Sequence, residues 1–82
     1  MAYRTQREWA LEKARELLGP EAVVRYFRSE VEPEWRYRIY RNPEDSKGKQ
    51  TESYGHGSSW VEALKYAAVR KSGLFYYELG NP

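Results

Sequence analysis

The residues most able to do chemistry stand together in the segment Gly-His-Gly-Ser-Ser, residues 55–59. His56, the single histidine, could serve as a general base for Ser58 or Ser59, but such a site also needs an orienting group and an oxyanion donor. Neither can be identified in the sequence. One histidine among scattered carboxylates is a poor donor set for a metal ion, and the chain has no cysteine. We therefore expect a non-enzymatic protein without a metal or a cofactor.

The same segment has the form of an anion-binding turn, because free N–H groups at a glycine-rich helix start attract phosphate. The candidate residues are Gly55, Gly57, Ser58 and Ser59. The segment lacks the lysine of a Walker loop and the G-x-G-x-x-G spacing. We favour the alternative, in which the glycines release the chain from a strand and Ser59 only caps the following helix.

A second candidate surface lies in residues 35–41, Trp-Arg-Tyr-Arg-Ile-Tyr-Arg, which alternate as a half-buried strand does. One set of side chains is expected to face the helices: Trp35, Tyr37 and Ile39. Arginine beside aromatic rings suits single-stranded nucleic acid, because charge meets the backbone and rings stack on bases. The candidate nucleic-acid surface comprises solvent-facing Arg36, Arg38 and Tyr40, extended by Arg25 and Lys65. The alternative, slightly favoured, is a solvated sheet face whose arginines pair with nearby glutamates.

Aromatic residues make up 16% of the chain, more than a minimal core of this size requires. Trp9 and Trp60 stand at helix starts, and Tyr76 and Tyr77 stand near the C-terminal end. Tryptophan is enriched in protein interfaces, so these four residues are candidate interface anchors. The alternative is that the two tryptophans wrap the edge of the core.

The elements that position these residues follow from spacing and caps. Thr5 and Glu8 form a capping box that begins a helix, and Gly19-Pro20 ends it. Ser59 and Glu62 form a second box, and the helix that follows ends at residues 71–73.

Between the helices, β-branched and aromatic residues predict strands over 22–31 and 35–41, with a weaker third strand over 50–55. The polar residues 42–49 are expected to form a mobile loop. Residues 74–79 predict either a fourth strand or a segment packed across the core. The chain is thus expected to be one α+β domain over residues 1–82, ordered over about 5–79. We predict the order α-β-β-β-α, with an antiparallel sheet, both helices on one face, and a C-terminal tail or fourth strand.

Residues 5–73 resemble the double-stranded-RNA-binding domain family, in which an aromatic strand is followed by a G-x-G-x-S segment and an alanine-rich helix. The matching residues are Trp35, Tyr37 and Ile39, then Gly55, Gly57 and Ser59, then Ala63, Ala67 and Ala68. The resemblance implies the αβββα fold. The family places RNA-contacting lysines directly after the serine, where this chain has Trp60 and Val61. The resemblance therefore supports the fold more than RNA binding.

Composition limits the remaining choices. The chain has 82 residues and a formal net charge of +2, so any nucleic acid must be met by a local patch. The absence of cysteine excludes a disulfide scaffold and suits the cytoplasm, and no apolar run is long enough to span a membrane. Two functions stay open: binding of nucleic acid or a nucleoprotein, and binding of a protein by an adaptor or inhibitor. By analogy of size and composition, the second class includes accessory proteins of phages and mobile elements that act against host defence complexes.

Overall fold

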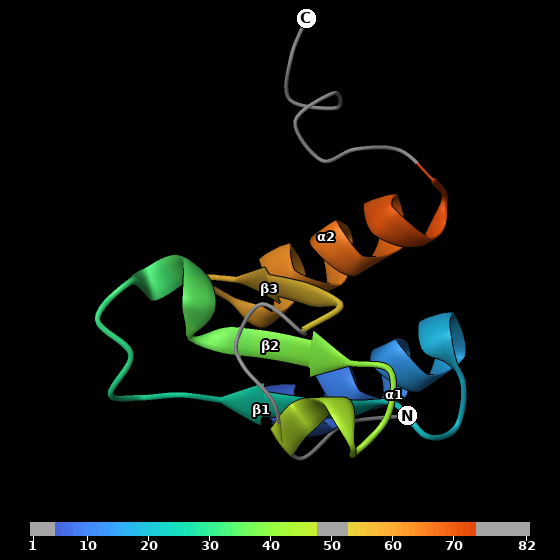
Figure 1. Cartoon of the computed structure of the whole chain (residues 1–82), viewed down its shortest axis with the longest axis horizontal. Coiled ribbons are helices and arrows are strands. Elements are labelled where there is room, and N and C mark those ends of the chain that lie inside the picture. Colours follow the sequence, from blue (N-terminus) through green and yellow to red (C-terminus); the bar gives the residue numbers. More distant parts are fainter. Residues whose placement is uncertain (1–4, 48–52, 74–82) are drawn as a thin grey trace, which may run out of the picture.

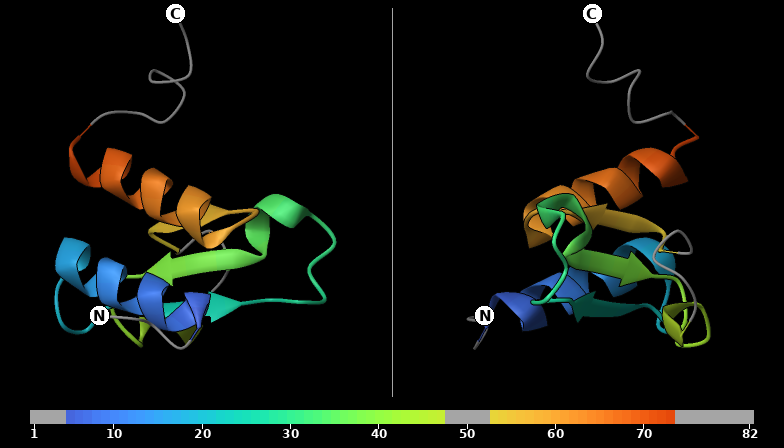
Figure 2. Two further views of the ribbon diagram at one scale, coloured as in Figure 1. Left: turned by 180° about the vertical axis from the view of Figure 1, so that it is seen from behind. Right: turned by 60° about the vertical axis from the view of Figure 1, so that its left-hand side comes forward.

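Two helices cover one face of a three-stranded antiparallel sheet (Figure 1). The computed structural model describes residues 5–47 and 53–73. In chain order, the elements are α1 (Gln6–Leu18), β1 (Val23–Tyr26), the 3-10 helix η1 (Pro33–Trp35), β2 (Tyr37–Tyr40), the 3-10 helix η2 (Asp45–Lys47), β3 (Gly55–Gly57) and α2 (Trp60–Lys71). Figure 2 shows both helices on the face of the sheet that is turned away in Figure 1. The predicted fold class and element order are confirmed, while residues 74–79 lie outside the described residues.

Both helices begin where the capping boxes predict. The Thr5 hydroxyl accepts a hydrogen bond from the Glu8 N–H at 3.1 Å, and the Ser59 hydroxyl accepts one from the Glu62 N–H at 3.2 Å. Gly19 ends α1 with a φ of 115°, a conformation that side chains disfavour. The helix termini are therefore determined by local sequence.

The helices lie close to the sheet because the contact residues are small. The buried core combines alanines of both helices with a few larger side chains: Ala10, Ala14, Ala22, Val24, Ile39, Trp60, Ala63 and Ala67. Strand β2 is central, pairing Val24 of β1 with Ile39 on one side and Ile39 with Gly55 of β3 on the other. Because cross-strand partners share a face, Val24, Ile39 and Gly55 all face the helices.

The glycines of the 55–59 segment belong to β3 itself. A Cβ atom built on Gly55 would lie 2.5 Å from the Ala63 carbonyl oxygen and 2.8 Å from the Ala67 Cβ. One built on Gly57 would lie 2.6 Å from the Glu62 Cβ. Both glycines are therefore required because α2 packs directly on the backbone of β3.

Strand boundaries are where the sequence-based predictions are wrong. The first strand is shorter than 22–31, and the third is Gly55–Gly57 instead of 50–55. The two glycines do not predict a strand from the sequence. Strand β3 depends instead on its pairing with β2 and its close packing against α2. Residues 42–47 of the predicted loop form a turn and η2, in which Asn42 Oδ1 accepts from the Asp45 N–H at 2.9 Å. The mobility of that loop stays a prediction.

The expected orientation of residues 35–41 is also partly wrong. Trp35 does not face the helices but lies in η1, because Pro33 favours the first position of a helix. Arg38 and Tyr40 do not face solvent: Arg38 is 6% exposed and Tyr40 is fully buried. Arg38 is covered by the segment after β1, which places the centroid of the Phe27 ring 3.8 Å from the Arg38 guanidinium carbon.

Candidate functional site

His56, the expected general base, is held by its neighbours. Its Nδ1 lies 2.8 Å from the Glu34 carbonyl oxygen, and since a carbonyl only accepts, Nδ1 donates. Its ring stacks on Trp35 with 3.8 Å between centroids and contacts the ring of Tyr66 at 4.5 Å. These contacts tie η1 and α2 to strand β3, which is a structural role.

The anion-binding turn already holds a carboxylate of this chain. Glu62 Oε2 accepts from the Ser58 hydroxyl at 2.9 Å, and Glu62 Oε1 lies 3.5 Å from the Ser58 backbone N. Ser59 is occupied as the cap of α2. A phosphate would have to displace Glu62 and overcome its negative charge, so this geometry favours the capping role over anion binding.

The arginines of β2 are likewise engaged. Arg38 Nη2 forms an ion pair with Glu30 Oε2 at 2.9 Å, and its Nε donates to the Trp35 carbonyl at 2.7 Å. Arg36 Nε donates to the Glu30 carbonyl at 2.8 Å. The alternative in which arginines of this face pair with glutamates therefore describes Arg38 well.

The five candidate nucleic-acid residues do not form one surface. Arg25 is exposed on the sheet face away from the helices, where it pairs in register with Arg38 and donates to the Ser46 carbonyl at 3.3 Å. Lys65 lies on α2, on the opposite side of the sheet. Tyr40 is buried.

Three arginines occupy backbone carbonyls along the edges of the sheet. From α1, Arg7 donates to the Val24 carbonyl at 3.3 Å and Arg15 to the Ala22 carbonyl at 3.2 Å. From α2, Arg70 donates to the carbonyls of Ser53 at 3.1 Å and Tyr54 at 3.4 Å, just before β3. Charged side chains at an edge strand oppose the addition of another strand.

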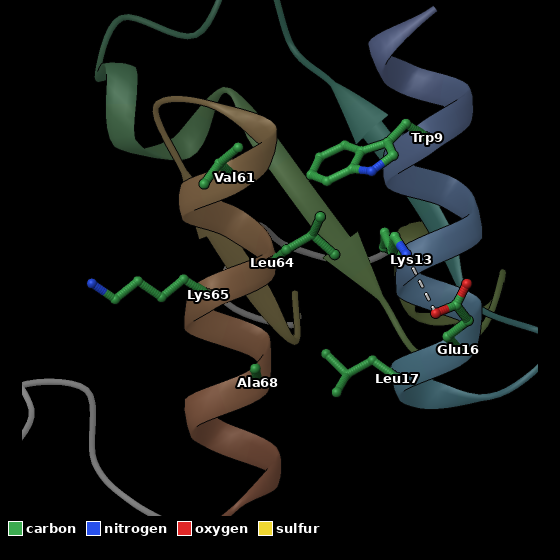
Figure 3. A pocket seen from close by; sticks show the side chains of 8 residues that line it. All are labelled: Trp9, Lys13, Glu16, Leu17, Val61, Leu64, Lys65 and Ala68. Carbon is green, nitrogen blue, oxygen red and sulfur yellow. Dashed lines mark ion pairs between the residues drawn. The ribbon is translucent and has the colours of Figure 1, made fainter. Parts of the chain in front are cut away.

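An apolar hollow lies between α1 and α2, on the side away from the sheet (Figure 3). It has a volume of about 490 Å³, and we call it the inter-helix groove. Eight side chains line it: Trp9, Lys13, Glu16, Leu17, Val61, Leu64, Lys65 and Ala68. Figure 3 shows Trp9 beside Val61 at one end and Leu17 nearer Ala68 at the other, so the helices run in the same direction. At the far end, Lys71 Nζ donates to the Leu17 carbonyl.

Helix α2 carries two apolar stripes, which explains the groove. Trp60, Ala63 and Ala67 are buried in the core. Val61, Leu64 and Ala68, spaced i, i+3 and i+7, line the groove; Leu64 also packs against the core, whereas Val61 is 64% exposed. Helical spacing alone would place Val61, Leu64, Ala67 and Ala68 on a single apolar face. The sequence analysis missed the stripe that lines the groove. The apolar residues of α2 span an arc wider than one contact face, which indicates a second apolar surface.

The two helix-start tryptophans differ in their surroundings. Trp60 is 6% exposed and meets Tyr37 edge to face at 4.8 Å between centroids, so it belongs to the core as the alternative expected. Trp9 is half-buried and lines the groove. The other candidate anchors, Tyr76 and Tyr77, lie outside the described residues.

Comparison with known proteins found no family model, curated protein or solved structure that matches this chain. The resemblance to the double-stranded-RNA-binding domain family therefore stays a prediction, although the element order agrees with it. Within residues 5–47 and 53–73, no helix is long and apolar enough to cross a membrane. The same residues contain no group of three or more His, Asp or Glu side chains placed to hold a metal ion.

Proposed function

We propose that this chain is a non-enzymatic binding module that docks a partner protein in the inter-helix groove. The observation that carries the proposal is the second apolar stripe of α2, Val61, Leu64 and Ala68, which faces α1 across an open groove and away from the sheet. A partner would cover this stripe together with Trp9, and tryptophan is the residue most often dominant in binding energy.

The magnitudes favour a reversible complex. Complete burial of one valine or leucine side chain contributes about 1.5–3 kcal/mol, and association costs at least about 4 kcal/mol in lost freedom of motion. The groove offers five apolar side chains, some already half-covered: Trp9, Leu17, Val61, Leu64 and Ala68. We therefore expect a dissociation constant of roughly micromolar order, which corresponds to a binding free energy of about 8 kcal/mol.

The side chains most suited to catalysis are already held by contacts within the fold, and this supports a binding role. His56 is fixed by the Glu34 carbonyl and two aromatic rings, and Ser58 and Ser59 are engaged with Glu62. A nucleophile and base would have to leave these contacts before they could meet.

The test is a display screen in which random peptides are selected on the full chain and then compared on two variants. Val61→Asp places a charge in the groove, in the first turn of α2, where a carboxylate is tolerated by the helix dipole. Val31→Asp is the matched control, because Val31 is 84% exposed and does not line the groove. We expect selected peptides that lose binding to the first variant and keep it to the second. A selection without any such peptide would contradict the proposal.

A second candidate, binding of single-stranded nucleic acid, is favoured by one cluster. The centroid of the Tyr54 ring lies 5.5 Å from the guanidinium carbon of Arg41 and 4.6 Å from that of Arg70. Exposed charge beside a ring is the combination that stacks a base and neutralises its phosphate. Arg25, exposed on the sheet face away from the groove, would offer a bound strand a further phosphate contact.

The test of this candidate is the salt dependence of oligonucleotide binding. Removing two phosphate contacts with Arg25→Ala/Arg41→Ala should flatten the slope of log affinity against log salt by about 1.4. Lys13→Ala/Lys65→Ala removes the same charge from the groove and should leave the slope unchanged. No binding by the parent at low salt, or an equal loss in both double variants, would reject this surface.

A further inference from the structure

We infer that residues 74–79, Leu-Phe-Tyr-Tyr-Glu-Leu, dock on the outer side of helix α2 and cover Val69. The occupant of this site is thus a segment of the same chain that lies outside the described residues. The inference does not depend on the proposed function, because Val69 does not line the inter-helix groove. It assigns the C-terminal aromatic residues to an intramolecular contact.

Val69 is buried on a side of α2 that faces away from the core. It is 8% exposed, yet it is not part of the core cluster. Two residues advance a helix by about 200°, so Val69 points almost opposite to Ala67, which packs against β3. On the same helix, Val61 also lies outside the core cluster and is 64% exposed. Something other than the sheet therefore covers Val69.

The described neighbours of Val69 on this side of α2 do not explain its burial. Lys65 and Ser72, four residues before it and three after it, are themselves exposed. The Ser72 hydroxyl donates to the Val69 carbonyl at 2.7 Å, which is a contact with the backbone and not with the side chain. The cover must therefore come from residues outside 5–47 and 53–73.

Among those residues, 74–79 have the composition and the position to cover an apolar side chain. Residues 48–52, Gly-Lys-Gln-Thr-Glu, have no large apolar side chain. Residues 1–4 lead into α1, which lies across the groove from α2. Residues 74–79 begin five positions after Val69, and five of the six are leucine, phenylalanine or tyrosine.

The end of α2 turns the chain back toward Val69. The Gly73 N–H donates to the Arg70 carbonyl at 3.1 Å, and Gly73 has a φ of 86°. Both features belong to the Schellman motif, in which a left-handed glycine ends a helix. The residue after that glycine frequently makes an apolar contact with the third helical residue from the end, which here pairs Leu74 with Val69. Local geometry and composition therefore agree on Leu74 as the first contact.

The experiment uses single engineered cysteines in the full chain, which has no cysteine of its own. Cysteine is a small apolar residue and suits a buried valine position. We expect Val69→Cys to react with a thiol reagent about tenfold more slowly than Val61→Cys, because its reaction requires local opening. Each rate is divided by that of the same variant unfolded in urea, which removes differences in intrinsic thiol reactivity. Equal normalised rates would overturn the inference.

A second substitution identifies the segment that covers Val69. Adding Leu74→Ser to Val69→Cys should raise the normalised rate about fivefold, because the covering contact is weakened. Val31→Ser is the matched control, since Val31 is 84% exposed and lies far from α2 in the sequence, and it should leave the rate unchanged. No acceleration by Leu74→Ser, or the same acceleration by Thr51→Ala in the segment 48–52, would overturn the inference.

Two further measurements use the unsubstituted side chains and the concentration of the protein. Nuclear Overhauser effects between the methyl groups of Val69 and Leu74 are expected in the unmodified chain, and their absence would overturn the inference. The labelling rate of Val69→Cys should not depend on protein concentration. A rate that falls as concentration rises would assign the cover to a second copy of the chain and overturn the intramolecular contact.

Discussion

Single residues in this domain have roles that depend on what lies across from them. Glycine at position 55 is the clearest case, because its missing side chain is what admits α2 to the sheet. Arg38 is another, since its charge is neutralised by Glu30 under the Phe27 ring instead of facing solvent. Neither role can be deduced from the local sequence, because the partners come from segments elsewhere in the chain.

Gly55→Ala should destabilise the domain by about 2–3 kcal/mol, because overpacking a core forces neighbouring backbone to move. The added Cβ would meet backbone atoms of α2, which cannot yield as a flexible side chain does. Gly73→Ala is the control: it meets nothing within 4 Å but has a φ of 86°, so it should cost about 1–2 kcal/mol. Urea denaturation of both variants measures the difference, and an unchanged midpoint for Gly55→Ala would refute the close packing of β3 on α2.

Arg38→Ala should lower the free energy of unfolding by about 1–3 kcal/mol, because Glu30 loses its partner in a part-buried site. Arg41→Ala removes an exposed arginine with a 3.9 Å contact to Asp45 and should change stability by less than about 0.5 kcal/mol. Thermal melting of the two variants distinguishes them. Equal, small losses would mean that Arg38 is as solvent-exposed as the sequence pattern suggests.

Tyr40→Phe should leave stability unchanged or raise it by up to about 1 kcal/mol. The Tyr40 hydroxyl is buried, and within the described part of the chain it has no hydrogen-bond partner. Removing an unsatisfied buried group relieves its desolvation cost. A loss of about 1 kcal/mol or more in a melting experiment would mean that the hydroxyl is bonded in solution.

Among the secondary-structure elements, the sequence predicts the features that depend on neighbouring residues and misses those that depend on residues far along the chain. The caps at Thr5 and Ser59, the glycine stop at Gly19 and the order of elements all follow from short-range patterns. Strand β3 could not be predicted at residues 55–57, because two glycines carry no strand preference and the strand depends on its neighbours. The groove-lining stripe of α2 was missed for a related reason. The helical spacing of alanine and leucine does not show whether each residue packs against the sheet or lines the groove.

Ser59→Ala should cost about 1 kcal/mol of stability, the usual loss when an N-cap side chain is removed. Ser59→Gly should cost only a few tenths, because glycine also suits the N-cap conformation. Chemical denaturation of both variants measures this order. If alanine were tolerated as well as glycine, the Ser59 hydroxyl would not be the working cap of α2.

At the scale of the whole molecule, the two sides of the sheet differ in what they leave open. On one side, Phe27 and Glu30 cover Arg38 and η1 packs on His56, while Arg25 stays exposed. On the other side, parallel helices leave an apolar groove with lysines at its rim. The contrast moves the proposed binding surface from the sheet to the helices.

The most direct measurement follows the three tryptophan indole N–H signals during titration with a peptide selected in the display screen. Trp9 lines the groove, Trp60 is buried in the core, and Trp35 stacks on His56, so each reports on a different region. We predict that the Trp9 signal shifts and saturates as the peptide binds, while the Trp35 and Trp60 signals stay nearly fixed. Single Trp→Phe variants assign the signals. Saturable binding that leaves Trp9 unchanged, or that shifts Trp35 instead, would contradict docking in the inter-helix groove.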